Sequence, residues 1–195
     1  MKKKLSAGWI VLIVIAALLV IAIIATVGTY NGLAQKREAV SAAEADIQTQ
    51  LQRRADLIPN LISTVKVYME HETEVIDAVT EARAKMTGAD STADKLQADE
   101  ELSSALSRLL VVVENYPDLK SNQNFIQLQD ELAGTENRIT ASRKDYNEKA
   151  QTYNSSIITF PANIFAGIFG FEKAEYFQAD EGAQTVPDAG ELFNS

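Results

Sequence analysis

Cysteine is absent from this chain of 195 residues, and histidine occurs once, at position 71. Without cysteine the chain cannot form a disulfide, a thiolate zinc site, a thiol nucleophile or the lipidated cysteine of a lipoprotein. One histidine cannot supply the paired Glu-x-x-His motifs of a di-iron bundle, and Val75 stands where a metalloprotease helix would carry its second histidine. We interpret His71 as a structural or solvated helix residue. The sequence therefore predicts no catalytic residues, no cofactor and no metal site, and hence a protein that is not an enzyme.

Positive charge is scarce in most of the chain. Lys2, Lys3 and Lys4 precede residue 28, whereas all 27 acidic residues follow it together with the other 15 basic residues. The part after residue 28 therefore carries a formal net charge of −12. Such a surface repels phosphate backbones, and it lacks the clusters of Lys and Arg with interleaved aromatics that form a nucleic-acid groove. We expect no nucleic-acid partner.

The first long segment of the chain is apolar. Residues 7–28 contain no charged side chain, and at about 1.5 Å per residue a helix of this length crosses a hydrocarbon core of about 30 Å. The alternative is a cleaved signal peptide, whose apolar region is usually about 7–15 residues long and ends in small residues. Here Ile23, Ile24 and Val27 occupy those final positions. We therefore expect a basic N-terminal tail (residues 1–6) and an uncleaved transmembrane anchor (residues 7–28) in contact with membrane lipid.

The basic residues around this segment predict its orientation. Three lysines precede it, whereas only Lys36 and Arg37 occur in the 20 residues that follow. Because Lys and Arg favour the cytoplasmic side of a membrane, we expect a single-pass protein with a cytoplasmic N-terminus and an external soluble domain. Trp9 and Tyr30, near the two ends of the segment, fit the aromatic belts of membrane interfaces.

Apolar residues after the anchor recur at steps of three, four and seven, which is the spacing of one helix face. The stripe consists of Leu33, Val40, Ala43, Ile47, Leu51, Ala55, Ile58, Ile62, Val65, Met69, Ile76, Val79 and Met86. Because no Gly/Ser linker follows Gly28, we expect the anchor to continue into one long amphipathic helix over about residues 29–86. A bend at Gly28 or Gly32 and a kink at Pro59 are expected within it.

Turn residues divide the rest of the chain into further helices. Residues 87–92 (TGADST) combine a glycine with N-cap side chains and predict the first turn. A helix over about residues 93–115 then ends before a proline, and another over about residues 121–158, with Ser121 as its N-cap, ends before Pro161. These patterns predict an all-α protein, in which an N-terminal transmembrane helix continues into an antiparallel bundle of three or four long helices.

The most apolar stretch after the anchor is residues 160–171, FPANIFAGIFGF, which contain no charge. The stretch is too short for a second span, so we expect a short fourth helix over about residues 162–170. Three environments suit it: the bundle core, a contact between subunits, or the membrane surface. The candidate contact residues are Phe160, Ile164, Phe165, Ile168, Phe169 and Phe171. Residues 178–195 carry acidic but no basic side chains and predict an acidic flexible tail.

Several short motifs along the chain are specific when taken together. They are LQRRADLIPNL at 51–61, Val65-Lys66 with His71-Glu72, ENYPDLK at 114–120, Glu131-Leu132, TENRI at 135–139, RKDYN at 143–147, Tyr153-Asn154 and TFPANI at 159–164. With this order and spacing, over about residues 30–177, the chain resembles the LemA family of bacterial membrane proteins.

The resemblance implies a small protein of the bacterial inner (cytoplasmic) membrane with one N-terminal span and a LemA-like antiparallel helical bundle at residues 29–177. Combined with the distribution of basic residues, it places the soluble domain on the outer, periplasmic side. It also implies self-assembly. It implies no activity, because members of the family lack an established biochemical function.

Charged residues of the helices expected over residues 29–86 and 121–158 have two interpretations. If the long helices pack antiparallel, residues 53–56 and 136–138 fall near the same level. The residues concerned are Arg53, Arg54, Asp56, Glu136, Asn137 and Arg138. They form either a buried network that fixes helix register or a functional carboxylate and arginine site. Residues 114–120 similarly predict a turn between helices, or a partner-binding loop in which Tyr116 is exposed.

The apolar surface suggests a function. A bundle of about 130 residues has difficulty burying both the long stripe and residues 160–171, so that neighbouring subunits would cover the remainder. We therefore expect a non-enzymatic, membrane-anchored scaffold or assembly protein that forms homo-oligomers. The alternative is an envelope signalling or quality-control adaptor that binds another membrane protein through its acidic face and tail.

Overall fold

The computed structural model describes residues 7–178, which form six helices and a C-terminal extended segment. The helices are α1 (Ala7–Lys66), α2 (Thr73–Gly88), α3 (Thr92–Val113), α4 (Pro117–Lys120), α5 (Gln123–Ile158) and α6 (Ala162–Phe169). The all-α fold, with an apolar N-terminal helix that continues into a helical bundle, is confirmed. The predicted N-terminal tail, and the predicted acidic tail beyond its first residue, Gln178, lie outside the described residues.

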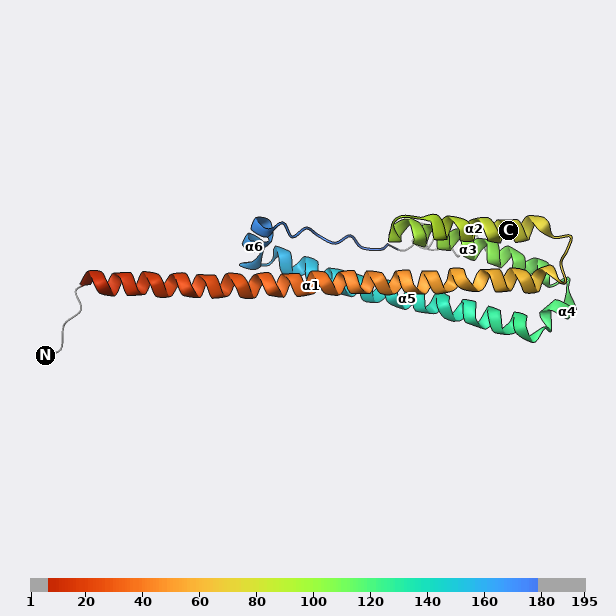
Figure 1. Cartoon of the computed structure of the whole chain (residues 1–195), viewed down its shortest axis with the longest axis horizontal. Coiled ribbons are helices and arrows are strands. Elements are labelled where there is room, and N and C mark those ends of the chain that lie inside the picture. Colours follow the sequence, from red (N-terminus) through yellow and green to blue (C-terminus); the bar gives the residue numbers. More distant parts are fainter. Residues whose placement is uncertain (1–6, 179–195) are drawn as a thin grey trace, which may run out of the picture.

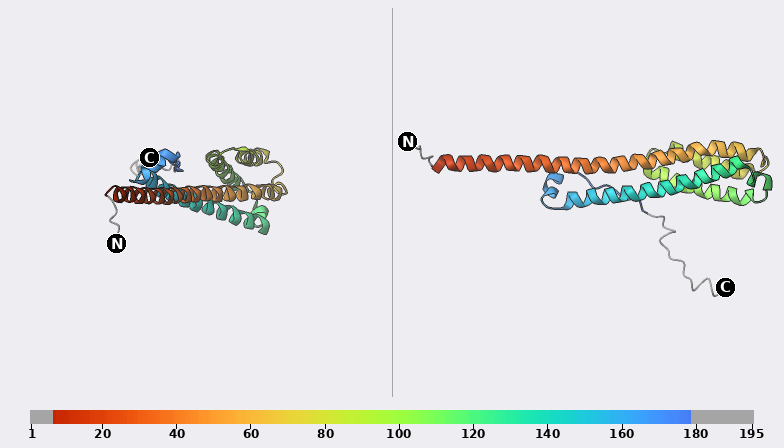
Figure 2. Two further views of the ribbon diagram at one scale, coloured as in Figure 1. Left: turned by 60° about the vertical axis from the view of Figure 1, so that its left-hand side comes forward. Right: turned by 90° about the horizontal axis from the view of Figure 1, so that it is seen from below.

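Helix α1 is a rod of 60 residues, about 90 Å long at 1.5 Å per residue, and the other helices pack beside the part that follows its apolar first third (Figure 1). It continues through Gly28 and Gly32 without a visible bend. Helices α2 and α3 form a hairpin, and α4 lies at the distal end of the rod, where α1 stops (Figures 1 and 2). Helix α6 lies crosswise beside α1, at the opposite end of the bundle.

Helix α5 is antiparallel to α1. Near the middle of α1, Lys36 donates a hydrogen bond to Ser156, close to the end of α5. Nearer the distal end, Arg53 pairs with Glu131, close to the start of α5, at 3.0 Å. The two helices therefore pack along most of the length of α5, and the α2–α3 hairpin packs only along the distal half of the bundle (Figure 2).

The core follows the predicted stripe. Every residue of the stripe is buried except Ile62, which is half-buried while its neighbour Leu61 is buried instead. Helices α3 and α5 contribute further large apolar side chains, among them Leu102, Leu109 and Phe125. The stripe is thus covered within a single copy of the chain. The expectation that neighbouring subunits are needed to cover it is wrong.

The prediction of one helix over residues 29–86 is also wrong. Helix α1 ends at Lys66, and the chain reverses so that α2 runs back along the bundle. The amides of Tyr68 and Met69 both donate to the carbonyl of Val65 at 3.0 Å, which closes the end of α1. The first turn of the bundle therefore lies at residues 67–72, and the turn predicted within residues 87–92 is the second one, at residues 89–91.

The reversal has a packing reason. A helix that continued past Lys66 would carry the apolar face of residues 76–86 beyond the end of the bundle, without a partner. In the hairpin this face is buried, with Ile76, Val79 and Met86 each no more than 3% exposed. Burial of such side chains contributes about 1.5–3 kcal/mol each, which outweighs the helical hydrogen bonds lost at the turn.

Pro59 lies inside α1, as predicted. Proline has no N–H, so the carbonyl of Ala55, four residues earlier, loses its helical donor. The Nε of Arg83 in α2 donates to this carbonyl at 2.8 Å. A side chain from the neighbouring helix therefore replaces the missing backbone donor and links α2 to α1.

The remaining helix boundaries agree with the predictions to within two residues. The predicted N-cap of α5 is wrong by one position: Asn122, not Ser121, accepts hydrogen bonds from the amides of Asn124 and Phe125, at 2.9 and 3.1 Å. Helix α6 ends at Gly170, whose φ of 69° is left-handed. Glycine adopts this conformation without the steric cost of a Cβ.

Candidate functional site

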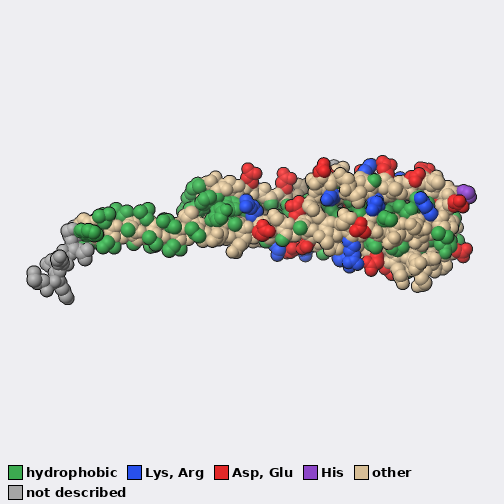
Figure 3. Space-filling model, viewed as in Figure 1, with side chains coloured by type: hydrophobic (Ala, Val, Ile, Leu, Met, Phe, Trp, Pro, Cys, Tyr) green, Lys and Arg blue, Asp and Glu red, His purple; other side chains and the backbone are tan. Residues whose placement is uncertain are grey.

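The first third of α1 is exposed and apolar. Every large apolar side chain from Trp9 to Val27 is at least 50% exposed. In Figure 3 this part of the helix forms a continuous apolar rod beside the charged body of the bundle. Among the described residues, α1 is the one helix long and apolar enough to cross a membrane.

Helix α6 lies where the apolar part of α1 ends. The ring of Tyr30, two residues after Gly28, packs edge-on against Phe169 and Phe171, with ring centroids 5.1 and 5.6 Å apart. The guanidinium of Arg37 lies over the ring of Phe171, 5.2 Å from its centroid. Such cation–π contacts stabilise a partly buried site by about 0.5–2 kcal/mol. These contacts fix α6 at the boundary between the apolar and the charged parts of the molecule.

The six candidate contact residues divide into two groups. Phe171 is buried and Phe165 is half-buried. The other four are Phe160, Ile164, Ile168 and Phe169, which are 77%, 52%, 69% and 44% exposed. We call these four side chains the α6 patch. In Figure 3 apolar side chains gather at the end of the body that adjoins the exposed part of α1. Within residues 7–178 most of the α6 patch is uncovered.

After α6 the chain runs back along α5, where two asparagines hold its backbone. The side-chain amide of Asn154 donates to the carbonyl of Ala174 at 2.8 Å and accepts from the amide of Ala174 at 2.9 Å. Asn147 makes the same pair of hydrogen bonds with Phe177, at 2.8 and 3.0 Å. Each asparagine thus pairs with the main chain much as a residue of a neighbouring β-strand would.

Two tyrosines, each one residue before an asparagine, complete the arrangement. The hydroxyl of Tyr153 donates to the carbonyl of Glu172 at 2.8 Å, and that of Tyr146 donates to the carbonyl of Glu175 at 2.9 Å. Burial raises the pKa of both phenols, so both remain donors at neutral pH. We call the four residues Tyr146, Asn147, Tyr153 and Asn154 the Tyr-Asn ladder. Both Tyr-Asn pairs belong to the motifs of the family resemblance, but no role was predicted for them.

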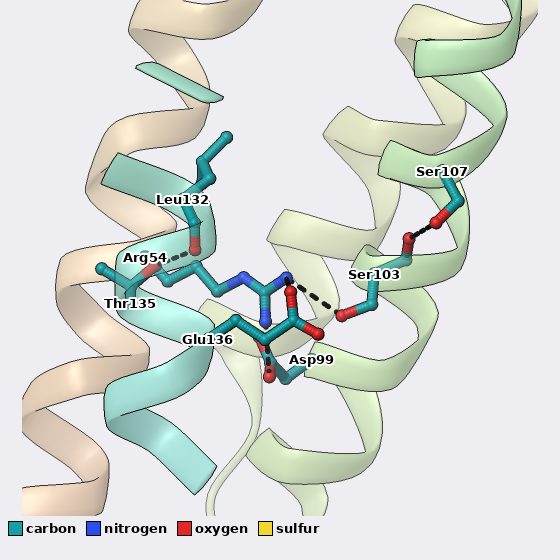
Figure 4. A network of polar contacts seen from close by, with 7 residues as sticks. All are labelled: Arg54, Asp99, Ser103, Ser107, Leu132, Thr135 and Glu136. Atoms are coloured by element: carbon teal, nitrogen blue, oxygen red, sulfur yellow. Dashed lines mark hydrogen bonds and ion pairs between the residues drawn. The ribbon is translucent and has the colours of Figure 1, made fainter. Parts of the chain in front are cut away.

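The predicted charged network exists, but its centre is different from the one expected. Arg54 is 2% exposed, and its Nη1 donates to Asp99 Oδ2 at 3.0 Å (Figure 4). Its Nη2 donates to Ser103 at 3.0 Å and lies 3.6 Å from a carboxylate oxygen of Glu136. Asp99 and Ser103 belong to α3, so Arg54 links three helices. Neither residue was predicted.

The other predicted members of the network lie on the surface. Asp56 accepts a hydrogen bond from Gln52, within α1. Arg53 and Arg138 both approach Glu131, at 3.0 and 3.9 Å. Asn137 is exposed. Exposed ion pairs of this kind contribute little to stability, usually less than about 1 kcal/mol.

The surroundings of Arg54 favour the structural interpretation. Burial raises the pKa of Asp99 and Glu136 raises it further, while Arg54 opposes the shift. A cavity of about 160 Å³ beside the guanidinium has both apolar and polar walls, from Leu109, Leu132 and Ser103 among others. Two carboxylates already neutralise the guanidinium. In the part of the chain that the structure describes, no three acidic or histidine side chains are placed to hold a metal ion.

The turn at residues 114–120 links the distal ends of the helices. The hydroxyl of Tyr116 is half-buried and donates to Glu72 at 3.0 Å. Just after this turn, the side-chain amide of Asn122 donates to the hydroxyl of Tyr68 at 3.0 Å. The Tyr116 bond joins the turn to residues 67–72, and the contacts of Tyr116 therefore favour a turn motif over an exposed binding loop.

Comparison with known proteins agrees with this architecture. The model of the LemA family matches residues 43–189. The chain belongs to the LemA family. Magnetosome protein MamQ 2 of Paramagnetospirillum magneticum is 30% identical to it over an alignment of 209 residues that covers 93% of this chain and 77% of the relative. Protein LemA of Metamycoplasma hominis is 28% identical over 169 residues, covering 86% and 77%.

A second MamQ protein, from Magnetospirillum gryphiswaldense, is 26% identical over 190 residues, covering 84% of this chain and 70% of the relative. These relatives and the exposed apolar part of α1 support the same conclusion: this LemA-family chain is a membrane protein with a helical soluble domain.

Proposed function

We propose that this LemA-family protein is a non-enzymatic, membrane-anchored scaffold whose copies associate at the bacterial inner membrane. The observation that carries the proposal is the apolar end of the molecule. The exposed part of α1 and the α6 patch adjoin each other, whereas charged side chains are spread over the rest of the body on the face seen in Figure 3. Monomeric soluble proteins rarely leave such contiguous apolar surface uncovered.

A rod-shaped anchor would hold the α6 patches of neighbouring copies at the same distance from the membrane. If α1 crosses the membrane in every copy, Tyr30 fixes each α6 patch near the membrane surface. Anchoring also confines the copies to two dimensions, which raises their effective concentration. Lateral contact through the α6 patch is therefore favoured over contact through the distal turns.

The polar groups of the described residues support a non-enzymatic role. The buried guanidinium of Arg54 is paired with carboxylates and links three helices. The Tyr-Asn ladder binds main chain rather than a reactive group. In neither cluster does a nucleophilic side chain hydrogen-bond to a basic side chain, as it does in most covalent catalysis.

The orientation is part of the proposal. With residues 7–28 as the span, the three N-terminal lysines favour a cytoplasmic N-terminus and a periplasmic bundle. Because the chain lacks cysteine, Ser121→Cys introduces a single thiol at the exposed distal end. A membrane-impermeant maleimide should label it once the outer membrane is permeabilised. Labelling that requires rupture of the inner membrane would place the bundle in the cytoplasm.

Association is tested by co-expressing two full-length copies with different affinity tags, extracting them in mild detergent and capturing one tag. The wild-type copies should co-purify. Phe160→Ser, Ile164→Ser and Ile168→Ser together should weaken co-purification, because they remove most of the α6 patch. The matched control replaces three exposed apolar residues of the distal half, Val67, Leu110 and Val111, by serine.

Wild-type copies that never co-purify would contradict the scaffold. Co-purification that survives loss of the α6 patch would show that the patch faces lipid or solvent instead of a neighbouring copy. The adaptor alternative depends on the acidic tail, most of which lies outside the described residues. It would gain support if removal of residues 179–195 released a bound membrane protein while the copies still associated.

A further inference from the structure

Residues 171–178 are bound to the rest of the molecule as a separate peptide ligand would be. They follow Gly170, where a left-handed φ of 69° ends α6. They then lie extended along α5, antiparallel to it, and the ladder holds them by hydrogen bonds to the main chain. Arg143 adds a further bond, from its guanidinium to the carbonyl of Gln178, at 2.7 Å.

The spacing of the ladder explains why an extended chain fits it. Seven residues of a helix rise by about 10.5 Å, and three residues of an extended chain span about 10 Å. Asn154 and Asn147 are seven residues apart in α5. They therefore hydrogen-bond to Ala174 and Phe177, which are three residues apart in the segment. The two tyrosines repeat the same relation with carbonyls three residues apart.

The contacts define the chemical class of the ligand. All seven hydrogen bonds go to main-chain atoms of the segment, so they do not depend on its side chains. Every third side chain faces the protein: Phe171 is buried, Ala174 is half-buried, and the ring of Phe177 lies 4.5 Å from that of Tyr146. The site thus fits an extended peptide with an apolar residue at every third position.

The segment is attached mainly through α5. A groove of about 350 Å³ separates part of it from α1 and is lined by Val40, Glu44 and Lys173, among others. Lys173, Glu175 and Tyr176 of the segment are exposed. All the side chains that hydrogen-bond to the segment belong to α5, whereas Phe171 also contacts Tyr30 and Arg37 of α1. An exchanged segment would make the same contacts with α1 and α5 of the second copy.

We propose that the Tyr-Asn ladder is a peptide-binding site whose ligand in the assembled scaffold is residues 171–178 of a second copy. The inference rests on the proposed self-association. A second copy is the favoured source because the sequence that fits the ladder is present in every copy. Copies anchored in parallel also hold their ladders and segments at the same height. Exchange keeps all seven hydrogen bonds and changes the backbone only around Gly170, as in other domain-swapped dimers.

Cross-linking tests the exchange directly. Tyr146→Cys is placed in one tagged full-length copy and Phe177→Cys in another, so that each copy has one thiol while both ladder asparagines remain. After co-expression and mild oxidation, the exchange predicts a disulfide between the differently tagged copies. Each variant expressed alone should give much less covalent dimer. Equal amounts of dimer in all three samples, or none in the co-expressed pair, would overturn the exchange.

Complementation provides an independent test. One copy carries Asn147→Ala and Asn154→Ala and lacks a working ladder, and the other carries Ala174→Pro and Phe177→Pro and lacks the two amide donors. Neither variant alone can form the ladder contact, either within one copy or between two identical copies. The co-expressed pair should therefore associate about 100-fold more tightly than either variant alone, because one copy still supplies a segment and the other a ladder.

Matched control variants distinguish loss of this binding site from general destabilisation of the fold. The control for the ladder is Asn137→Ala, which changes an exposed asparagine of the same helix. The control for the segment is Lys173→Pro with Tyr176→Pro, which places both prolines at exposed positions other than the two whose amides donate to the ladder. Both controls should associate as wild type does. Failure of co-expression to restore association, or full association of each variant alone, would overturn the inference while leaving the scaffold intact. Wild-type copies that do not associate would instead contradict the proposed function.

Discussion

The carbonyl of Ala55 accepts a hydrogen bond from a side chain because Pro59 cannot supply the backbone donor. Arg83→Met keeps most of the apolar stem of the side chain but leaves this buried carbonyl unpaired. We expect the free energy of unfolding to fall by about 1–3 kcal/mol. In a Pro59→Ala background, which restores the N–H, the same substitution should cost less than about 1 kcal/mol. Denaturant unfolding in detergent gives both values, and equal costs in the two backgrounds would contradict the compensation.

Asp99 gives a pH dependence whose sign follows from its burial. Its pKa is raised in the folded protein, chiefly by burial, so the folded state binds the proton more tightly than the unfolded state does. Its contribution to stability is therefore greatest at low pH and falls as the pH rises from about 4 through the raised pKa. The unfolding free energy of wild type minus that of Asp99→Asn should decrease over this range and then level off. A difference that increases with pH would contradict the assignment.

The residue-level predictions from sequence succeeded where spacing alone was enough. Arg54 and Glu136 were placed at one level because the two long helices were expected to be antiparallel. Asp99, the closest charged partner of Arg54, could not be found, because a helix predicted to run on to residue 86 kept α3 away from Arg54. The Tyr-Asn repeat is visible in the sequence, but its ligand is the extended chain after α6, which no periodicity indicates.

Helix α6 contains Gly167 and is followed by Gly170, and replacement of these two glycines by alanine should have opposite effects on the stability of the helix. An added Cβ would meet no atom within 4 Å at either Gly167 or Gly170. Gly167 is helical, so Gly167→Ala should stabilise α6 by about 0.5–1 kcal/mol. Gly170 is left-handed, so Gly170→Ala should destabilise it by about 1 kcal/mol or more. Hydrogen exchange of the α6 amides measures both changes, and shifts of the same sign would contradict this geometry.

The break between α1 and α2 shows where element prediction from sequence reaches its limit. Residues 67–72 contain neither glycine nor proline. The apolar stripe also keeps its phase across the break, since Met69 and Ile76 are seven residues apart. Local propensity therefore favours one continuous helix, and packing of α2 against its neighbours decides otherwise. By contrast, the ends of α3 and α5 are marked by caps and prolines and were predicted closely.

At the scale of the whole molecule, apolar and charged surfaces are separated along one rod. The apolar part of α1 occupies one end, α6 marks the boundary, and the acidic bundle occupies the rest (Figures 1 and 3). Composition alone predicted this division, because all charged residues except three N-terminal lysines follow residue 28. If lipid covers residues 7–28 and neighbouring copies cover the α6 patch, this separation of apolar and charged surfaces leads the copies to associate.

Native mass spectrometry of the full-length protein, released from mild detergent, distinguishes an anchored assembly from a single or shortened chain, because one spectrum reports both chain mass and copy number. We expect the anchored assembly to give particles of two or more chains, each of which retains the apolar residues 7–28. Particles of a single chain, or chains that begin beyond Val27, would contradict it.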